Sequence, residues 1–212
     1  MPSMDADAVE LRVLGCLIEK QRTTPDQYPL SLNALRLAAN QATNREPVVE
    51  YDEGTIRAAL DRLGRRGWTR LTSGPSSRVA KFRHLLDEAL GLTQSQLVLL
   101  GVLMLRGPQT VGELRARSER LYPFPSTDDV EFALGELAGR ELAERLPRRA
   151  GEREERWIQR LGDTASGARE PAQAAPWTEP EPGVQHPDLE QRVARLEREV
   201  ADLLERLDAM PG

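Results

Sequence analysis

The sequence has few of the residues from which enzymatic and metal sites are usually built. Its 212 residues include one cysteine, Cys16, and two histidines, His84 and His186, which are far apart in the chain. One cysteine cannot form an internal disulfide, and this inventory cannot assemble a Cys/His metal site. There is also no recognisable nucleophile–base pair and no glycine-rich phosphate loop. We therefore expect no cofactor and no enzymatic activity.

Long apolar runs are missing as well. The longest, residues 97–105, has nine residues, whereas a membrane-spanning helix needs roughly 20. The first residues are acidic and lack the basic region and apolar run of a secretory signal. These features predict a cytoplasmic protein without a membrane partner.

Aromatic residues make up only 4% of the chain, and charged residues 30%. The net charge of −5 is unevenly distributed: residues 1–90 carry 13 Lys/Arg and 12 Asp/Glu, residues 91–162 carry 11 of each, and residues 163–212 carry 5 and 11. The acidic excess therefore lies in the tail, and it does not exclude a nucleic-acid partner for the rest of the chain.

An internal repeat organises the first 162 residues. Residues 11–20 align with 97–106, with Gly15 opposite Gly101, and residues 55–63 align with 129–137. Both members of the second pair place apolar residues at the i, i+3, i+4, i+7 spacing of a helix with one buried face. A duplicated module is the simplest explanation.

Each copy is predicted to contain three helices followed by a two-stranded hairpin. Helix-capping residues are Ser31 and Asp52 in the first copy, and the pairs Thr93/Gln96 and Ser126/Asp129 in the second. Gly67 suits the left-handed position after the third helix. The expected hairpins are 68–72 with 79–84, and 142–146 with 156–160. The predicted fold is thus mainly α with small β-hairpins (α+β): two tandem winged-helix domains, at 5–90 and 91–162, plus a C-terminal helix.

The remaining 50 residues predict two further segments. Residues 163–187 contain five prolines and little to bury, which is typical of a disordered linker. Residues 188–210 carry a heptad pattern that favours a parallel two-stranded coiled coil and hence a homodimer. An amphipathic helix that folds back on its own domains is the alternative. The heptad positions are Leu189, Val193, Leu196, Val200, Leu203 and Leu207.

Basic residues concentrate on the third helix and hairpin of the first module. Residues 54–86 contain eight basic side chains and one acidic one, Asp61. This pattern predicts a duplex-DNA interface in which the helix enters the major groove and the hairpin touches phosphates. The alternative is a solvated helix face whose arginine stems cover apolar surface. The candidate residues are Arg57, Arg62, Arg65, Arg66, Arg78, Lys81 and Arg83.

The equivalent helix of the second module has a different outer face. It presents Asp128, Glu131 and Glu136 together with the apolar Phe132, so it is expected to repel phosphate and to make a protein contact instead. The second hairpin alternates arginine with glutamate, which predicts a solvated strip of ion pairs.

Three other features have an ordinary structural explanation. Cys16 lies in an apolar helix and is expected to be a buried, unreactive thiol. His84, beside Arg83, is expected to lie at an exposed strand end. The polar stretch 40–47 is rich in side-chain amides; it suits either a ligand or loop capping.

Residues 13–48 (VLGCLIEKQRTTPDQYPLSLNALRLAANQATNREPV) closely resemble the start of the YceH-like proteins, a bacterial family, and the likeness continues through 55–67 and 99–124. It covers approximately residues 7–160. The resemblance implies two winged-helix domains and supplies no catalytic or ligand-binding residues. The leading hypothesis is a dimeric DNA-binding, transcription-related protein, and the rival is a protein-interaction adaptor that uses winged-helix surfaces without nucleic acid.

Overall fold

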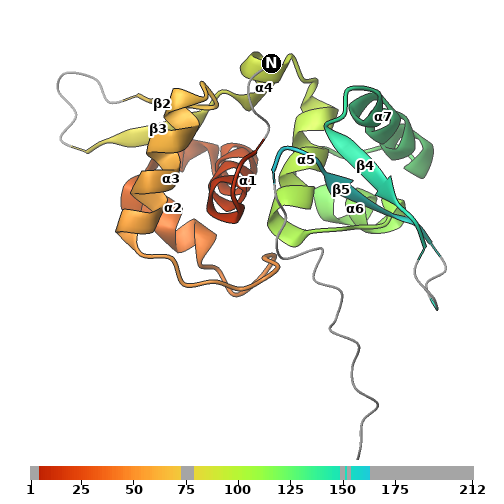
Figure 1. Ribbon diagram of the computed structural model, residues 1–212, viewed down its shortest axis with the longest axis horizontal. Coiled ribbons are helices and arrows are strands. Elements are labelled where there is room, and N and C mark those ends of the chain that lie inside the picture. The colour runs from red at the N-terminus through yellow and green to blue at the C-terminus, as the bar shows by residue number, and fades with distance from the viewer. Residues whose placement is uncertain (1–4, 73–78, 149–150, 152–153, 163–212) are drawn as a thin grey trace, which may run out of the picture. The chain divides into compact units, whose positions relative to one another are not determined.

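The computed structural model describes residues 5–72, 79–148, 151 and 154–162 (Figure 1). Within these residues the chain is mixed α/β, with seven α-helices and two small antiparallel sheets. The linker predicted at 163–187 and the heptads predicted at 188–210 lie outside the described residues. None of the described helices combines the length and apolar character needed to cross a bilayer.

The first half runs from α1 to α4. Its elements are α1 (Ala8–Thr23), the short 3₁₀ helix η1 (Pro25–Gln27), β1 (Leu30–Ser31), α2 (Leu32–Ala39), α3 (Glu53–Arg65), β2 (Thr69–Leu71), β3 (Lys81–His84) and α4 (Leu86–Leu90). The capping predictions are confirmed: Ser31 accepts from the amide of Ala34, and Asp52 accepts from the amide of Thr55. Gly67 has the expected positive φ, +75°. The sequence missed three short elements, η1, β1 and α4.

The second half repeats this order with fewer strand residues. It comprises α5 (Gln94–Arg106), α6 (Val111–Ser118), α7 (Thr127–Gly139), β4 (Ala143–Leu146) and β5 (Arg156–Gln159). Both predicted capping boxes are present, Thr93 with Gln96 before α5 and Ser126 with Asp129 before α7. Each box satisfies amide groups that a helix start otherwise leaves without partners, so these starts are fixed locally.

The two sheets share one arrangement, except that the second has no full counterpart of β1. In the first half the order is β1-β3-β2, with Leu30 opposite Phe82 and Thr69 opposite His84. In the second half β4 pairs with β5, and a single bridge joins Gln109 to Trp157 where β1 would lie. The third strand of the second sheet is therefore reduced to one residue pair.

Main-chain hydrogen bonds repeat between the halves. The amide of Trp68 donates to the carbonyl of Leu63 at 2.9 Å, and the amide of Leu142 donates to the carbonyl of Leu137 at 2.9 Å. The carbonyl of Trp68 then accepts from the amide of Leu85, as that of Leu142 accepts from the amide of Arg160. This shared exit from the third helix into the hairpin further supports a duplicated unit.

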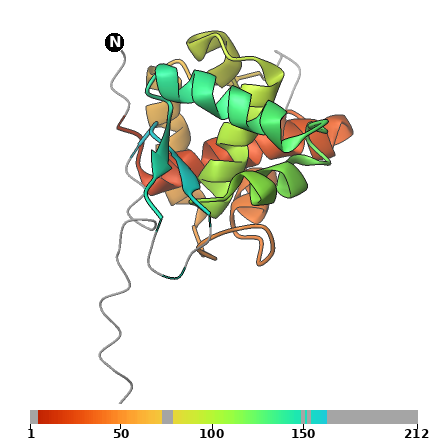
Figure 2. The same ribbon diagram turned by 90° about the vertical axis from the view of Figure 1, so that its right-hand side faces the viewer.

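The first helices of the two copies join the halves. α1 packs against α5 more extensively than any other two described elements pack together (Figures 1 and 2). A Cβ at Gly15 would lie 2.8 Å from Cγ of Leu105, and a Cβ at Gly101 would lie 2.9 Å from Cγ2 of Ile18. The aligned glycines thus allow the two equivalent helices to approach closely, each against the other's side chains.

One buried side chain contradicts the sequence prediction. His84 is only 2% exposed, so the expectation of an exposed strand end was wrong. It ends β3 on the core side of the sheet, opposite Thr69 and against Tyr28, a long-range neighbour that its local sequence does not indicate. Cys16 is fully buried, as predicted, and burial raises the pKa of its thiol to about 11.

Candidate nucleic-acid interface

The candidate interface begins with the orientation of α3. Ile56, Ala59, Leu60 and Leu63 are buried, and this stripe fixes which side chains of the helix face solvent. Arg57 and Arg65 fall on the exposed side, two turns apart, with Asp61 between them. α3 therefore presents two guanidinium groups to solvent on one face.

Three arginines of this region have no carboxylate partner among the described residues: Arg57 and Arg65 on α3 and Arg70 on β2. All three are exposed, and no hydrogen bond or ion pair engages their guanidinium groups within the part of the chain that the structure describes. Exposed, unpaired guanidinium groups are available to phosphate oxygens, which they bind in a bidentate manner.

Two of the predicted arginines instead tie α3 to the start of α1. Arg62 Nη2 lies 2.6 Å from Asp7 Oδ2 and its Nε lies 3.6 Å from Glu10 Oε1. Arg66 Nε lies 3.5 Å from the same Glu10 oxygen, and its guanidinium stacks 5.6 Å from the Trp68 ring. Their charge is largely balanced by carboxylates, so the structure places them in packing between helices.

The outer face of the first sheet contributes further basic residues. Arg70 lies opposite Arg83 in the β2–β3 ladder, and Lys81 lies opposite Ser31. Arg83 is paired with Glu88 at 3.1 Å. Lys81 is exposed. Arg78, predicted for the hairpin tip, lies outside the described residues.

His84 and Tyr28 hold this hairpin against α1. His84 Nε2 lies 2.8 Å from Gln21 Oε1, Nδ1 lies 3.4 Å from Asp87, and the His84 amide donates to the Tyr28 hydroxyl at 2.9 Å. Burial lowers the pKa of His84, and burial raises the pKa of Tyr28 to about 12. Both side chains are thereby kept neutral near pH 7. The sequence analysis did not predict that His84 and Tyr28 fix the hairpin in place. The one hint in the sequence was that Tyr28 belongs to the run of residues that carries the family resemblance.

α7, the counterpart of α3, reverses the charge. The repeat alignment places Glu131 opposite Arg57, Phe132 opposite Ala58 and Glu136 opposite Arg62. Phe132 is 70% exposed, as predicted, and both glutamates are exposed. The same helical position therefore carries cations in one half, and anions with an aromatic ring in the other.

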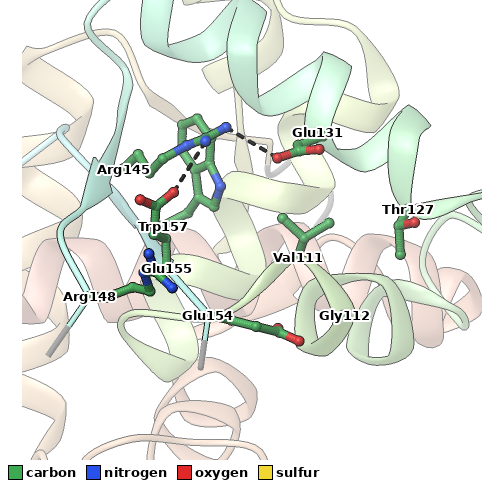
Figure 3. Close-up of a pocket in the computed structure, with 9 residues that line it drawn as sticks. All are labelled: Val111, Gly112, Thr127, Glu131, Arg145, Arg148, Glu154, Glu155 and Trp157. Atoms are coloured by element: carbon green, nitrogen blue, oxygen red, sulfur yellow. Dashed lines mark hydrogen bonds and ion pairs between the residues drawn. The ribbon is translucent and has the colours of Figure 1, made fainter. Parts of the chain in front are cut away.

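The charge of Arg145, on the second hairpin, is balanced by one carboxylate from α7 and one from the hairpin. Arg145 lies 3.2 Å from Glu131 and 3.2 Å from Glu155, and its guanidinium lies 4.8 Å from the buried Trp157 ring (Figure 3). These residues line a cleft of about 480 Å³ between α6, α7 and the hairpin. The ion pairs predicted within the hairpin are confirmed for Arg145 with Glu155. Arg156 lies 2.9 Å from Glu113, which is on α6 and outside the hairpin. Of the arginines lining the cleft, only Arg148 lacks a carboxylate partner among the described residues.

Among the described residues, no group of three or more His, Cys, Asp or Glu side chains is arranged to hold a metal ion. Taken together, the architecture and the surface define a duplicated helical protein with one basic and one acidic copy of the same outward-facing helix.

Comparison with known proteins places this duplicated chain in a family. Residues 6–152 match the family described as "Protein of unknown function, DUF480". A UPF0502 protein of Stenotrophomonas maltophilia is 46% identical over 206 residues, which cover 97% of this chain and 94% of the relative. A UPF0502 protein of Azotobacter vinelandii is 53% identical over 156 residues, 74% of this chain and 69% of the relative. The chain therefore belongs to the DUF480/UPF0502 family of bacterial proteins, with which the YceH-like resemblance is consistent.

Proposed function

We propose that the chain is a cytoplasmic, non-catalytic DNA-binding protein built from two winged-helix modules. The order α1-β1-α2-α3-β2-β3, with β3 central in its sheet, is the order of a winged helix, whose third helix enters the major groove. The second half supports the same reading through α5, the Gln109–Trp157 bridge, α6, α7 and β4-β5.

The observation that carries the proposal is the set of exposed, unpaired arginines on α3 and β2. Arg62, Arg66 and Arg83 each have a carboxylate partner, whereas Arg57, Arg65 and Arg70 have none among the described residues. Three exposed cations that have no carboxylate partner among the described residues, in a region where other arginines are paired, favour an external anion. Two turns of helix separate Arg57 from Arg65, about 12 Å along the axis, which suits contacts to a groove and its flanking phosphates.

Fluorescence anisotropy with duplex DNA at low salt tests the proposal. Replacing both Arg57 and Arg65 with glutamate is expected to weaken binding roughly a hundredfold, because two cations become anions next to phosphate. The matched comparison is Arg57→Glu alone against Arg148→Glu, since Arg148 is also exposed and without a carboxylate partner among the described residues but lies in the second half. The proposal fails if the wild-type chain does not bind, or if Arg57→Glu and Arg148→Glu lose affinity equally.

The second half and the tail are proposed to join protein chains. An exposed Phe132 flanked by acidic residues resembles a protein-contact patch more than a groove reader. If the tail heptads pair, light scattering gives a dimer for the full chain and a monomer for a chain ending at Gly162. If the two chains form the same oligomer, the tail is not the dimerisation element. The Phe132→Ser variant then tests whether the second half joins the chains.

A protein-interaction adaptor remains the second candidate, and the same exposed Phe132 favours it. Two results together would distinguish the adaptor. The wild-type chain would capture a partner protein that the Phe132→Ser variant does not, and neither chain would bind duplex DNA at any salt concentration.

A further inference from the structure

A second cleft, of about 570 Å³, lies where the two halves meet. Its walls come from the end of α1, the loop after α2, the end of α5, and α6. Its volume falls in the range of small-molecule sites. The loop that contributes to it includes Gln41, Thr43 and Asn44, part of the amide-rich stretch for which the sequence left a ligand role open.

The charge of this cleft is positive. Lys20, Arg106, Arg117 and Arg120 line it, and Glu19 is the one acidic residue in its lining. Glu19 is already engaged by Arg45, whose guanidinium lies 2.6 Å and 3.1 Å from its two carboxylate oxygens. Lys20 also lies 3.6 Å from the Glu19 oxygen that Arg45 binds at 2.6 Å. Because the buried Arg45 already offsets the charge of Glu19, the lining cations outnumber the carboxylates that compensate them among the described residues.

The lining cations have weak partners or none among the described residues. Arg120 is exposed and has no partner within that part of the chain. Arg117 lies 3.4 Å from Glu113, whose other carboxylate oxygen is bound more closely by Arg156. Arg106 donates to the Asn44 side chain, and its pKa is lowered by burial first and then by the charges of Arg117 and Arg45. A bound anion would relieve this mutual repulsion.

Part of the cleft lining is apolar. Val102 and Leu105, both largely buried, contribute apolar atoms, while Gln41 and Thr43 contribute donors and acceptors. Charged groups that fix an oxyanion, together with apolar lining that accepts an organic body, are the two elements of a typical small-ligand site.

We propose that this cleft binds a small organic anion with two or more negative charges, held by Lys20, Arg106, Arg117 and Arg120. The shared chemistry is a phosphate or carboxylate cluster on an organic body. Such a ligand contacts both halves and therefore stabilises the arrangement in which they share one core. The proposal holds whether or not the chain binds DNA.

Isothermal titration calorimetry at low salt, with the full chain and ADP, pyrophosphate or citrate as probes, tests it. ADP represents a phosphate source with an organic body, pyrophosphate represents the phosphate groups alone, and citrate represents a carboxylate source. At least one probe is expected to bind saturably, and Arg120→Glu is expected to weaken that binding by roughly tenfold or more. Arg120 is exposed, so its replacement leaves the fold intact, as circular dichroism can verify. Arg148→Glu, outside the cleft, should change the affinity by less than about twofold.

Two outcomes would overturn the proposal. One is the absence of saturable binding by all three probes. The other is equal weakening in Arg120→Glu and Arg148→Glu, which would show a general charge effect. If no probe binds but Arg120→Glu weakens duplex DNA binding while Arg148→Glu does not, the cleft belongs to a nucleic-acid surface and the small-ligand proposal is wrong.

Discussion

The two halves of this protein share one main-chain arrangement, but their third helices present surfaces of opposite charge. The exit from the third helix is made by equivalent hydrogen bonds at Trp68 and Leu142, yet Arg57 on α3 corresponds to Glu131 on α7. The apolar stripe constrains the residues on the core-facing side of a helix, and the cap constrains those at its start. The outer face is free to diverge, and after duplication it is where a new function can arise.

The largest expected effect comes from breaking the join between the halves. Gly15→Val is expected to reduce the free energy of unfolding by about 3 kcal/mol, because the new side chain would overlap Leu105 and force α1 away from α5. Gly101→Val should behave alike against Ile18. The measurement is urea denaturation monitored by circular dichroism.

Gly135→Ala is the control for this pair. Gly135 lies on α7, and a Cβ added there would meet no other atom within 4 Å, so alanine should stabilise the protein by about 0.5–1 kcal/mol through helix propensity. A stable Gly15→Val protein would show that close approach of α1 and α5 is not what joins the halves.

A smaller effect is expected where the copies use different residues for the same left-handed turn. Gly67 has φ +75° and its counterpart Glu141 has φ +57°. Gly67→Glu should destabilise the protein by about 1–2 kcal/mol, whereas Glu141→Gly should be neutral or stabilising by up to about 1 kcal/mol. Thermal denaturation of both variants checks the opposite signs. Effects of the same sign would mean that the two turns are not equivalent.

The smallest effect is a pH dependence confined to the first half. Buried His84 corresponds in the sheet to the non-titrating, buried Gln159. Burial lowers the folded-state pKa of His84 below its ordinary value of 6.5. The unfolded chain therefore binds the proton more readily, and stability is full above about pH 6.5 and is lost as the pH falls toward the lowered folded pKa.

His84→Gln makes the first half resemble the second and should flatten the stability profile below about pH 6.5, where the unfolded-state histidine becomes protonated. Urea midpoints across that range, for the wild type and the variant, supply the measurement. His186→Gln, which replaces the other histidine of the chain, is the control. A wild-type profile that His84→Gln leaves unchanged would assign the pH dependence to other groups.

Local sequence signals were sufficient for much of this fold. Helix starts at Ser31, Asp52, Thr93 and Ser126 were predicted because a cap and its amide lie within three residues. The apolar stripe of α3 was predicted from its spacing, and the exposure of Phe132 followed from the corresponding stripe of α7. The sequence analysis missed the two-residue strand β1 and the five-residue helix α4, because segments this short show little periodicity in their apolar residues.

The candidate site was only partly predictable, because pairing between distant residues decides which arginines are free. Asp7 is 55 residues from Arg62 in the sequence yet lies 2.6 Å away in the structure. Nothing near Arg62 distinguishes it from Arg57 before the chain is folded. The contacts of His84 with Gln21 and Tyr28 are of the same long-range kind, and the basic cleft is assembled from four separate segments.

Salt dependence of duplex binding is the sharpest test of whether Arg57 and Arg65 contact phosphate, because each cation that does so releases counterions when DNA binds. The logarithm of the binding constant should fall linearly with the logarithm of salt concentration, and replacing both Arg57 and Arg65 with glutamine should make that slope shallower by about 2. The same slope in the wild type and the double variant would contradict the account, because these two arginines would then make no contact with phosphate.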